Sequence, residues 1–283
     1  MKQDFVKLSK HCSILPYGDN DRPNIGIISG SETSIIVDGG NSESHFGLLS
    51  SAARIENVEY LLLTHNHWDH VCGSSFFYSG KVVSSVVTAG KIGRMNDMVW
   101  DADGIESAYQ VNRIPEFTRN NMLCELKLND FRPFEFRVPD ITCDTEAVFD
   151  LGNLTCRYIP IMSCHCDGQM GVYVEQDKVF FIGDILWPDM DRKQDEWFYD
   201  LEKFKLMSEQ ILSVDADVYV ESHADPIPRN MLELWLRKMQ SIMEGVKYAN
   251  KSAREAESLL PQELKQSNLG YEELLYGACD RVV

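Results

Sequence analysis

Residues 64–70 read Thr-His-Asn-His-Trp-Asp-His and follow directly on the apolar run of residues 58–63. The run predicts a strand that ends in four residues of metal-binding types, namely His65, His67, Asp69 and His70. Side chains two residues apart on a strand end point to the same side, so the first two histidines can converge on one ion. The tight turn that must follow can direct the other two residues toward a second ion. Imidazole and carboxylate ligands together suit zinc, iron or manganese.

A polar strand-to-helix loop that is rich in histidine by chance is the alternative interpretation of this stretch. Three of the seven histidines of the chain lie in it. So high a concentration of one ligand type in a single loop favours a metal site.

The pattern H-x-H-x-D-H after an apolar strand resembles the signature of the metallo-β-lactamase fold superfamily. Four further stretches resemble the other motifs of that superfamily and come in its order: SIIVDGG at 34–40, IPIMSCHCDG at 159–168, VFFIGD at 179–184 and VYVESH at 218–223. The resemblance implies an α/β (α+β) fold, a four-layer αββα sandwich of two mixed β-sheets flanked by helices. We expect one domain over residues 1–283, with residues 229–283 as a C-terminal helical extension.

Within the superfamily, the chain looks like the glyoxalase II-like dimetal hydrolases, which use seven metal ligands. The resemblance implies a first metal held by His65, His67 and His165. It implies a second metal held by Asp69, His70 and His223, with Asp184 as the bridge. Two divalent metal ions are expected, zinc first, with iron and manganese left open.

In such a site, a metal-bridging hydroxide attacks the substrate, and Asp69 is a candidate catalytic general base. The expected substrate is a small ester-like compound, namely a thioester, a lactone or a carboxylic ester. Asp38 is expected to support the site, because a carboxylate that accepts from a ligand's second ring nitrogen fixes its tautomer. A turn-forming Asp before two glycines is the local alternative for Asp38.

Other activities remain open. A mononuclear iron enzyme that resembles the persulfide dioxygenases would use the positions of His65, His165 and Asp184. A phosphodiesterase would use the same metals as an esterase. A non-catalytic binding module is disfavoured, because such descendants usually lose ligands and all seven are present here.

Charge and composition restrict the partners. The 283 residues carry a net charge of −17, and from residue 229 onward 8 Lys+Arg balance 8 Asp+Glu, so residues 1–228 hold the whole net charge. An acidic catalytic region repels polyanions, which argues for a small-molecule substrate and against nucleic acid. No apolar stretch approaches the ~18 residues needed to cross a bilayer, so no membrane partner is expected. The N-terminus lacks a signal-peptide core, and eight scattered cysteines indicate reduced thiols, so we expect a cytoplasmic protein.

Two aromatic-rich segments, residues 99–141 and 186–199, could form walls of a substrate cleft. A satellite apolar cluster or a contact in a homo-oligomer would explain them equally well. Cys164 and Cys166 flank one ligand position and are either small buried residues or an oxidation-sensitive control point.

The pattern of apolar residues also predicts individual elements. We expect a hairpin of residues 24–29 and 34–38, and helices over 44–55, 90–98, 201–214 and 229–259. Strands are expected over 58–63, 82–87, 123–128, 134–138, 147–151, 154–161, 171–175, 179–182 and 218–221. The last helix should bury one face that carries Leu232, Trp235 and Met239.

Overall fold

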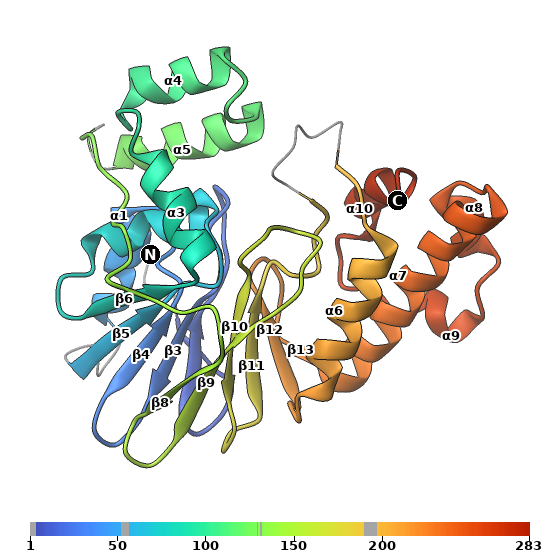
Figure 1. Ribbon diagram of the computed structural model, residues 1–283, viewed down its shortest axis with the longest axis horizontal. Helices are drawn as coiled ribbons and strands as arrows, with labels where there is room; N and C mark the ends of the chain where they lie inside the picture. The colour runs from blue at the N-terminus through green and yellow to red at the C-terminus, as the bar shows by residue number, and fades with distance from the viewer. Residues whose placement is uncertain (1–3, 52–56, 129, 131, 190–196) are drawn as a thin grey trace.

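Two β-sheets pack face to face between two layers of helices (Figure 1). This computed structural model describes residues 4–51, 57–128, 130, 132–189 and 197–283. The expected four-layer αββα sandwich is confirmed.

The first sheet has seven strands in chain order: β1 (Val6–Lys7), β2 (Cys12–Leu15), β3 (Ile25–Ser29), β4 (Ser34–Val37), β5 (Val58–Leu62), β6 (Lys81–Ser84) and β7 (Ile141–Thr142). Its pairs are antiparallel up to β4 and parallel from β4 to β7. The second sheet has six strands in the order β13 (Ile227–Pro228), β12 (Val218–Glu221), β11 (Val179–Gly183), β10 (Met170–Val174), β9 (Thr155–Pro160) and β8 (Ala147–Asp150). Its β11–β12 pair is parallel, and the other pairs are antiparallel.

Helices cover the outer face of each sheet. The first sheet is covered by α1 (Glu43–Gly47), the 3₁₀ helix η1 (Leu48–Ser51), α2 (Trp68–Val71), the 3₁₀ helix η3 (Cys72–Phe76), α3 (Val86–Met95), α4 (Ala102–Gln110) and α5 (Glu116–Leu128). The second is covered by α6 (Leu201–Ser213) and α7 (Arg229–Ala249), followed by α8 (Ala253–Ser258), α9 (Gln262–Lys265) and α10 (Glu272–Cys279). None of the helices in the described ranges has both the length and the hydropathy to cross a bilayer.

Three apolar clusters fill the spaces between the layers. The middle cluster joins side chains of both sheets, including Ile35 and Leu62 from the first and Tyr158 and Phe181 from the second. Strands β10 and β11 are buried at every position, because sheet and helices cover both of their faces. The predicted apolar face of α7 is confirmed, since Leu232, Trp235 and Met239 are fully buried.

Strand direction brings the motif loops to one rim of the sandwich. Strands β9 and β11 are both antiparallel to β10, and β12 is parallel to β11, so β9, β11 and β12 run the same way. Strands β4 and β5 are also parallel to each other. Within each sheet, the carboxyl ends of these strands therefore meet at one edge.

Most strand predictions are confirmed. Strands β8 to β12 agree with the expected ranges to within one residue at each end. The hairpin pairs Ser29 with Ser34, and its turn is closed by Gly30 N–H donating to the Thr33 carbonyl over 2.9 Å. The short strands β1, β2, β7 and β13 were not predicted. The extent of the domain stays a prediction.

The strands predicted over 123–128 and 134–138 are wrong. Residues 123–128 belong to α5, whose buried positions include Met122 and Leu126, one helical turn apart. Phe134 makes only an isolated bridge to Trp100. The alternating apolar pattern of 123–128 is compatible with a strand, but packing on α4, and burial of Met122 and Leu126 in the apolar cluster of the first sheet, favour the helix.

Two other boundaries differ because of helix caps. The strand predicted over 82–87 ends at Ser84, since the Ser85 hydroxyl accepts from Thr88 N–H and starts α3. The helix predicted over 44–55 is only five residues of α1 followed by η1. Gly47, a poor helix former, ends the α-helical part. Residues 52–56 lie outside the described residues.

The long helix predicted over 229–259 is also divided. Asn250 has a left-handed φ of 50° and ends α7. Ser252 and Glu255 then form a capping box that starts α8.

Candidate metal centre

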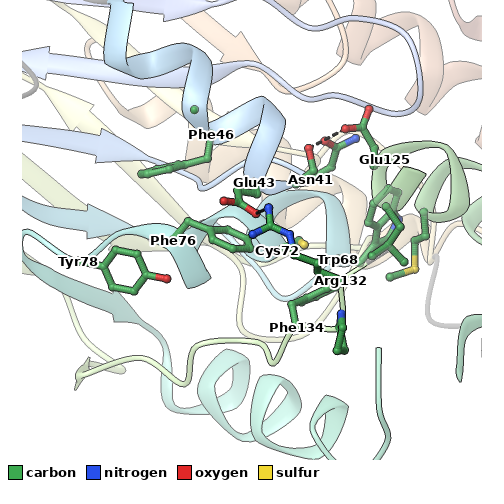
Figure 2. Close-up of a pocket in the computed structure, with 15 residues that line it drawn as sticks. Asn41, Glu43, Phe46, Trp68, Cys72, Phe76, Tyr78, Glu125, Arg132 and Phe134 are labelled. Carbon is green, nitrogen blue, oxygen red and sulfur yellow. Dashed lines mark hydrogen bonds and ion pairs between the residues drawn. The ribbon is translucent and has the colours of Figure 1, made fainter. Parts of the chain in front are cut away.

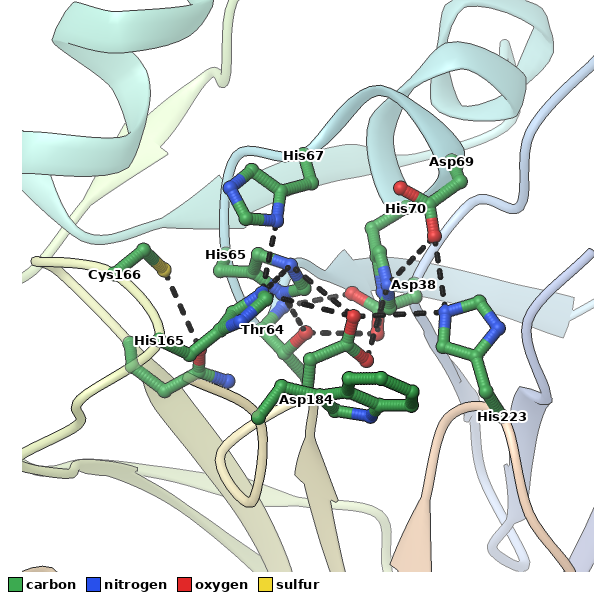
Figure 3. A network of polar contacts seen from close by, with 12 residues as sticks. Asp38, Thr64, His65, His67, Asp69, His70, His165, Cys166, Asp184 and His223 are labelled. Carbon is green, nitrogen blue, oxygen red and sulfur yellow. Dashed lines mark hydrogen bonds and ion pairs between the residues drawn. The ribbon is translucent and has the colours of Figure 1, made fainter. Parts of the chain in front are cut away.

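All seven predicted ligand positions gather at the rim, each just beyond the carboxyl end of a strand (Figure 3). Residues 65–70 follow β5, His165 follows β9, Asp184 follows β11, and His223 follows β12. Segments more than 150 residues apart in the sequence thus meet in one cluster. Their function as metal ligands stays a prediction.

The first ligand group consists of His65, His67, His165 and Asp184. The Nε2 atom of His165 lies 2.8 Å from Nδ1 of His67 and 3.3 Å from Nε2 of His65. The Oδ2 atom of Asp184 lies 3.8 Å from His65 Nε2 and 3.7 Å from His165 Nε2. Three imidazoles and one carboxylate therefore face a common centre.

The second ligand group consists of Asp69, His70, Asp184 and His223. The Nε2 atom of His70 lies 3.1 Å from Asp69 Oδ2 and 3.3 Å from Asp184 Oδ1. The Nε2 atom of His223 lies 3.2 Å from Asp69 Oδ2 and 3.5 Å from Asp184 Oδ2. Asp184 thus belongs to both groups, as the bridging role requires.

Both groups fit divalent metal ions. Nitrogen and oxygen ligands ~2.1 Å from a tetrahedral zinc ion lie ~3.4 Å from one another, close to most of these separations. His70 Nε2 and Asp184 Oδ1 are also buried, and although they lie 3.3 Å apart, neither has a partner with hydrogen-bond geometry among the described residues. Unpaired buried polar atoms are rare and call for an explanation, and ligation of a cation provides one.

Asp38 orients the second ligand group through a fixed network. Its Oδ2 atom accepts from His70 Nδ1 over 2.9 Å and from the Thr64 hydroxyl over 2.8 Å. Its Oδ1 atom accepts from Thr64 N–H over 2.7 Å. Asp38 has a left-handed φ of 64°, and this costly conformation is held by the three hydrogen bonds. The Nε2 atom of His70 is thereby directed at the site.

The backbone at Gly183 brings Asp184 close to β5. Gly183 has a φ of 59°, and a Cβ atom there would lie 2.6 Å from Gln169 Nε2 and 2.7 Å from Thr64 Oγ1. Only glycine allows both the conformation and this approach. On the other side of the cluster, His165 Nδ1 donates to the Pro188 carbonyl over 3.2 Å, which leaves Nε2 to face the site.

Two imidazoles of the first ligand group, His65 and His165, are held neutral. Burial, together with the neighbouring His70 and His67, keeps the pKa of His65 well below its ordinary value. Burial and the nearby His67 lower the pKa of His165 to about 3. Neutral imidazole is the form that binds a metal.

In the second ligand group, the surroundings favour protonated histidines instead. Burial opposes the charge of His70 and His223, yet the carboxylates of Asp184 and Asp69 raise the pKa of both histidines well above the ordinary value. In return, these histidines outweigh burial and hold the pKa of Asp69 and Asp184 below the usual range.

Two further carboxylates near His223 were not predicted. Glu221 accepts from His223 N–H over 2.8 Å and from Trp187 Nε1 over 2.8 Å, and burial beside Asp184 raises its pKa to about 7. Asp21 lies 3.8 Å from His223 Nδ1, and burial near Asp69 raises its pKa to about 7. A glutamate that ends the apolar strand β12 was a recognisable signal, whereas Asp21 lies in a turn with no such signal.

The cysteines beside His165 are small buried residues. The Cys164 thiol donates to the Asp200 carbonyl over 3.3 Å, and burial raises its pKa to about 12. Cys166 donates to Gln169 Oε1 over 3.5 Å. A buried thiol with a raised pKa is a poor nucleophile, which argues against the oxidation-sensitive interpretation for Cys164.

The first aromatic segment contributes to the core and to the wall of a pocket. Trp100, Phe134 and Phe136 pack on one another beside the first sheet, which agrees with an apolar cluster, and Phe134 also lines a pocket together with Met122 and Leu126. Residues 187 and 188, in contrast, contact Glu221 and His165. Phe131 and residues 190–196 lie outside the described residues.

Comparison with known proteins identifies the family. The sequence model of the metallo-beta-lactamase superfamily matches residues 18–223. The chain belongs to this superfamily, as the resemblance of its motifs implied. No curated protein matches the chain.

Solved structures share the fold at low sequence identity. A metallo-beta-lactamase from Pontibacter korlensis is 18% identical with a TM-score of 0.54, over 81% of this chain and 95% of that one. A metallo-beta-lactamase family protein from Thermus thermophilus is 17% identical with a TM-score of 0.58, over 96% of this chain and 93% of that one. The sec-alkylsulfatase Pisa1 from Pseudomonas sp. is 16% identical with a TM-score of 0.61, over 99% of this chain and 50% of that one. Superfamily and His/Asp cluster together indicate a metal-dependent hydrolase.

Proposed function

We propose that the protein is a hydrolase of the glyoxalase II-like type that holds two divalent cations, zinc first, and cleaves a small ester-like substrate. The observation that carries the proposal is the position of Asp184. Its carboxylate lies within 3.8 Å of imidazole nitrogens in both ligand groups. One ion would be held by the first ligand group and the other by the second.

Bound cations would supply Lewis acidity and a water molecule that loses its proton near neutral pH. The remaining work falls to residues of the chain. Asp38 and the Pro188 carbonyl hold His70 and His165 in the tautomers that face the site. Asp69, whose pKa lies below its usual range, is ionised at rest and can take a proton at a carboxylate oxygen during turnover.

A small ester-like substrate agrees with the charge of the chain. The net charge of −17 opposes polyanions, so nucleic acid is disfavoured, although a small phosphodiester would suit the same ligands. A thioester, lactone or carboxylic ester avoids this repulsion.

We also propose a reducing compartment, the cytoplasm, as the location. All eight cysteines are free. Free buried thiols are the rule where glutathione and thioredoxin keep cysteines reduced.

Elemental analysis and a substrate panel test the proposed function. We expect two zinc ions per chain and hydrolysis of at least one compound among aryl esters, thioesters, lactones and small phosphodiesters. One iron per chain, no zinc and oxygen consumption with a persulfide would establish the mononuclear dioxygenase instead. Metal-loaded protein that cleaves none of the panel would contradict the proposed reaction.

A further inference from the structure

One concave site outside the two ligand groups has an unused polar group in its wall. It is a pocket of about 430 Å³ between α1, η3, α5 and residues 132–134 (Figure 2). This volume falls in the range of ~300–1,000 Å³ that is typical of small-molecule sites.

Much of the wall is apolar. Trp68, Met122, Leu126 and Phe134 all contribute to it. The first three are buried and belong to the apolar cluster between the first sheet and its helices. A flat apolar group would therefore displace water from this surface on binding.

The charged side chains of the wall are already paired. Glu125 is buried and accepts from Arg22 through both carboxylate oxygens, over 2.9 and 2.8 Å. Glu43 accepts from Arg132 over 3.0 Å. The pocket therefore offers no uncompensated charge from these pairs, which favours a neutral ligand.

Asn41 provides the unused group. The residue lines the pocket and is only 1% exposed. Its Nδ2 atom donates to the Asn20 carbonyl over 2.7 Å, whereas Oδ1 has no hydrogen-bond partner among the described residues. Rotating the amide by 180° would set Oδ1 against the Asn20 carbonyl, so the unpaired atom is an acceptor in the favoured orientation.

The pocket shares its supports with the second ligand group. Trp68 lies between the ligand positions His67 and Asp69 in the sequence. Asn41 binds the carbonyl of Asn20, and the next residue, Asp21, lies 3.8 Å from His223 Nδ1. Residues 65–72 thus contribute to both sites, and residues 20 and 21 contact one side chain of each.

We propose that this pocket binds the non-reacting part of the substrate, and that this part is a flat apolar group with a neutral hydrogen-bond donor, a hydroxyl or an amide N–H, directed at Asn41 Oδ1. The assignment to the substrate depends on the proposed hydrolase function. The binding of such a group does not, so the two can be tested separately.

A matched pair of probes tests the binding. We expect 4-fluorobenzyl alcohol to bind the full chain about fivefold more tightly than its methyl ether in fluorine NMR titrations, because only the alcohol can donate. The preference should be the same in metal-loaded and EDTA-treated protein. Absence of binding by either probe, or equal affinity for both, would overturn the proposal.

Substitutions test whether the preference for the alcohol over the ether arises in the pocket. Asn41→Leu should reduce the alcohol-to-ether ratio to about one. Phe134→Ala should weaken both probes and keep the ratio, which guards against misinterpreting a variant that folds poorly. Asn120→Leu, an exposed position on α5, is the matched control and should change neither affinity. An unchanged ratio in Asn41→Leu would exclude the proposed hydrogen bond.

Inhibition then connects the pocket to the substrate. The alcohol should raise the KM for phenyl acetate without lowering kcat, and Asn41→Leu should weaken this inhibition. Binding without competition would overturn the assignment to the substrate. If the panel of esters, thioesters, lactones and phosphodiesters is not hydrolysed at all, the proposed function fails, while the probe ratio still decides whether the pocket binds donors.

Discussion

The two ligand groups of the rim share Asp184 but differ in the charge of their other members. The first contributes three imidazoles whose surroundings disfavour a proton on His65 and His165. The second sets two imidazoles against the carboxylates of Asp69 and Asp184, which favour a proton on each ring. A cation therefore displaces no proton from His65 or His165, whereas in the second group it must compete with the protons on His70 and His223.

Substitution of Asp184, the residue that the two groups share, should have the largest effect on activity. Asp184→Ala should lower kcat/KM by more than about 100-fold, the upper range for residues that only support a ligand. Metal content should fall in both groups. Ester hydrolysis and elemental analysis are the measurements, with circular dichroism to verify the fold.

Asp177→Ala is the matched control for this variant. Asp177 is a partly buried carboxylate that accepts from His11 over 2.9 Å, away from both ligand groups. The control should keep its metals and its turnover. Near-normal turnover of Asp184→Ala would contradict a site that uses both groups.

A smaller loss of metal affinity and activity is expected when Asp38, which orients His70 in the second group, is substituted. Asp38→Asn keeps the shape of the side chain but removes the charge that faces His70 Nδ1. Loss of such a partner typically costs ~10–100-fold in metal affinity or activity. Competition with a chelator should reveal weaker binding of one ion and little change in the other. Equal weakening of both would argue against the assignment of Asp38 to the second group.

The pH dependence of metal binding separates the two groups directly. His70 and His223 must lose their protons before they can bind a metal ion. Below their raised pKa values, the metal affinity of the second group should therefore fall about tenfold per pH unit for each proton displaced. Dialysis at pH 6 should remove one of two zinc ions, and dialysis at pH 8 neither. His223→Ala should hold the same single ion at both pH values. Parallel loss of both ions at pH 6 would disprove the contrast.

The residues at the rim were the part of the molecule that the sequence predicted best, because residues of metal-binding types follow directly on apolar strands there. The resemblance to the superfamily motifs implied His165, Asp184 and His223 as ligands. The ends of apolar strands agree with that assignment, because the sandwich brings the loops that follow them to one edge. Residues 99–141 lacked this constraint. Their apolar residues suit a strand or a helix, and only packing of Met122 and Leu126 decides.

Residues that contact the site from turns were beyond prediction. Asp21 reaches His223 because Arg22 forms an ion pair with the buried Glu125 that ties this turn to α5. Asn41 lines the pocket because Asp38, three residues earlier, is anchored to Thr64. Both depend on contacts between distant segments, which no local pattern encodes.

The smallest expected effects concern stability of the protein without metals, where the two groups should respond to pH with opposite sign. For His165, the pKa is about 3 in the folded chain and ~6.5 when unfolded, so the unfolded state gains a proton first and stability falls as the pH decreases below 6.5. For His223, the raised pKa contributes stability that is complete below pH 6.5 and is lost as the pH rises through the folded value.

Melting curves of EDTA-treated variants at pH 8 and pH 5 measure this contrast. At pH 5 the low pKa of His165 lowers the free energy of unfolding by about 2 kcal/mol, a loss that is absent at pH 8. On acidification, the melting temperature of His165→Ala should therefore rise by about 5 °C relative to that of the wild type. His223→Ala should instead lose stability relative to wild type over the same change, because it lacks the protonated ring that pairs with Asp69 and Asp184. Shifts of the same sign in both variants would mean that the two groups do not differ in proton affinity, and the expected selective loss of one zinc at pH 6 would lose its physical basis.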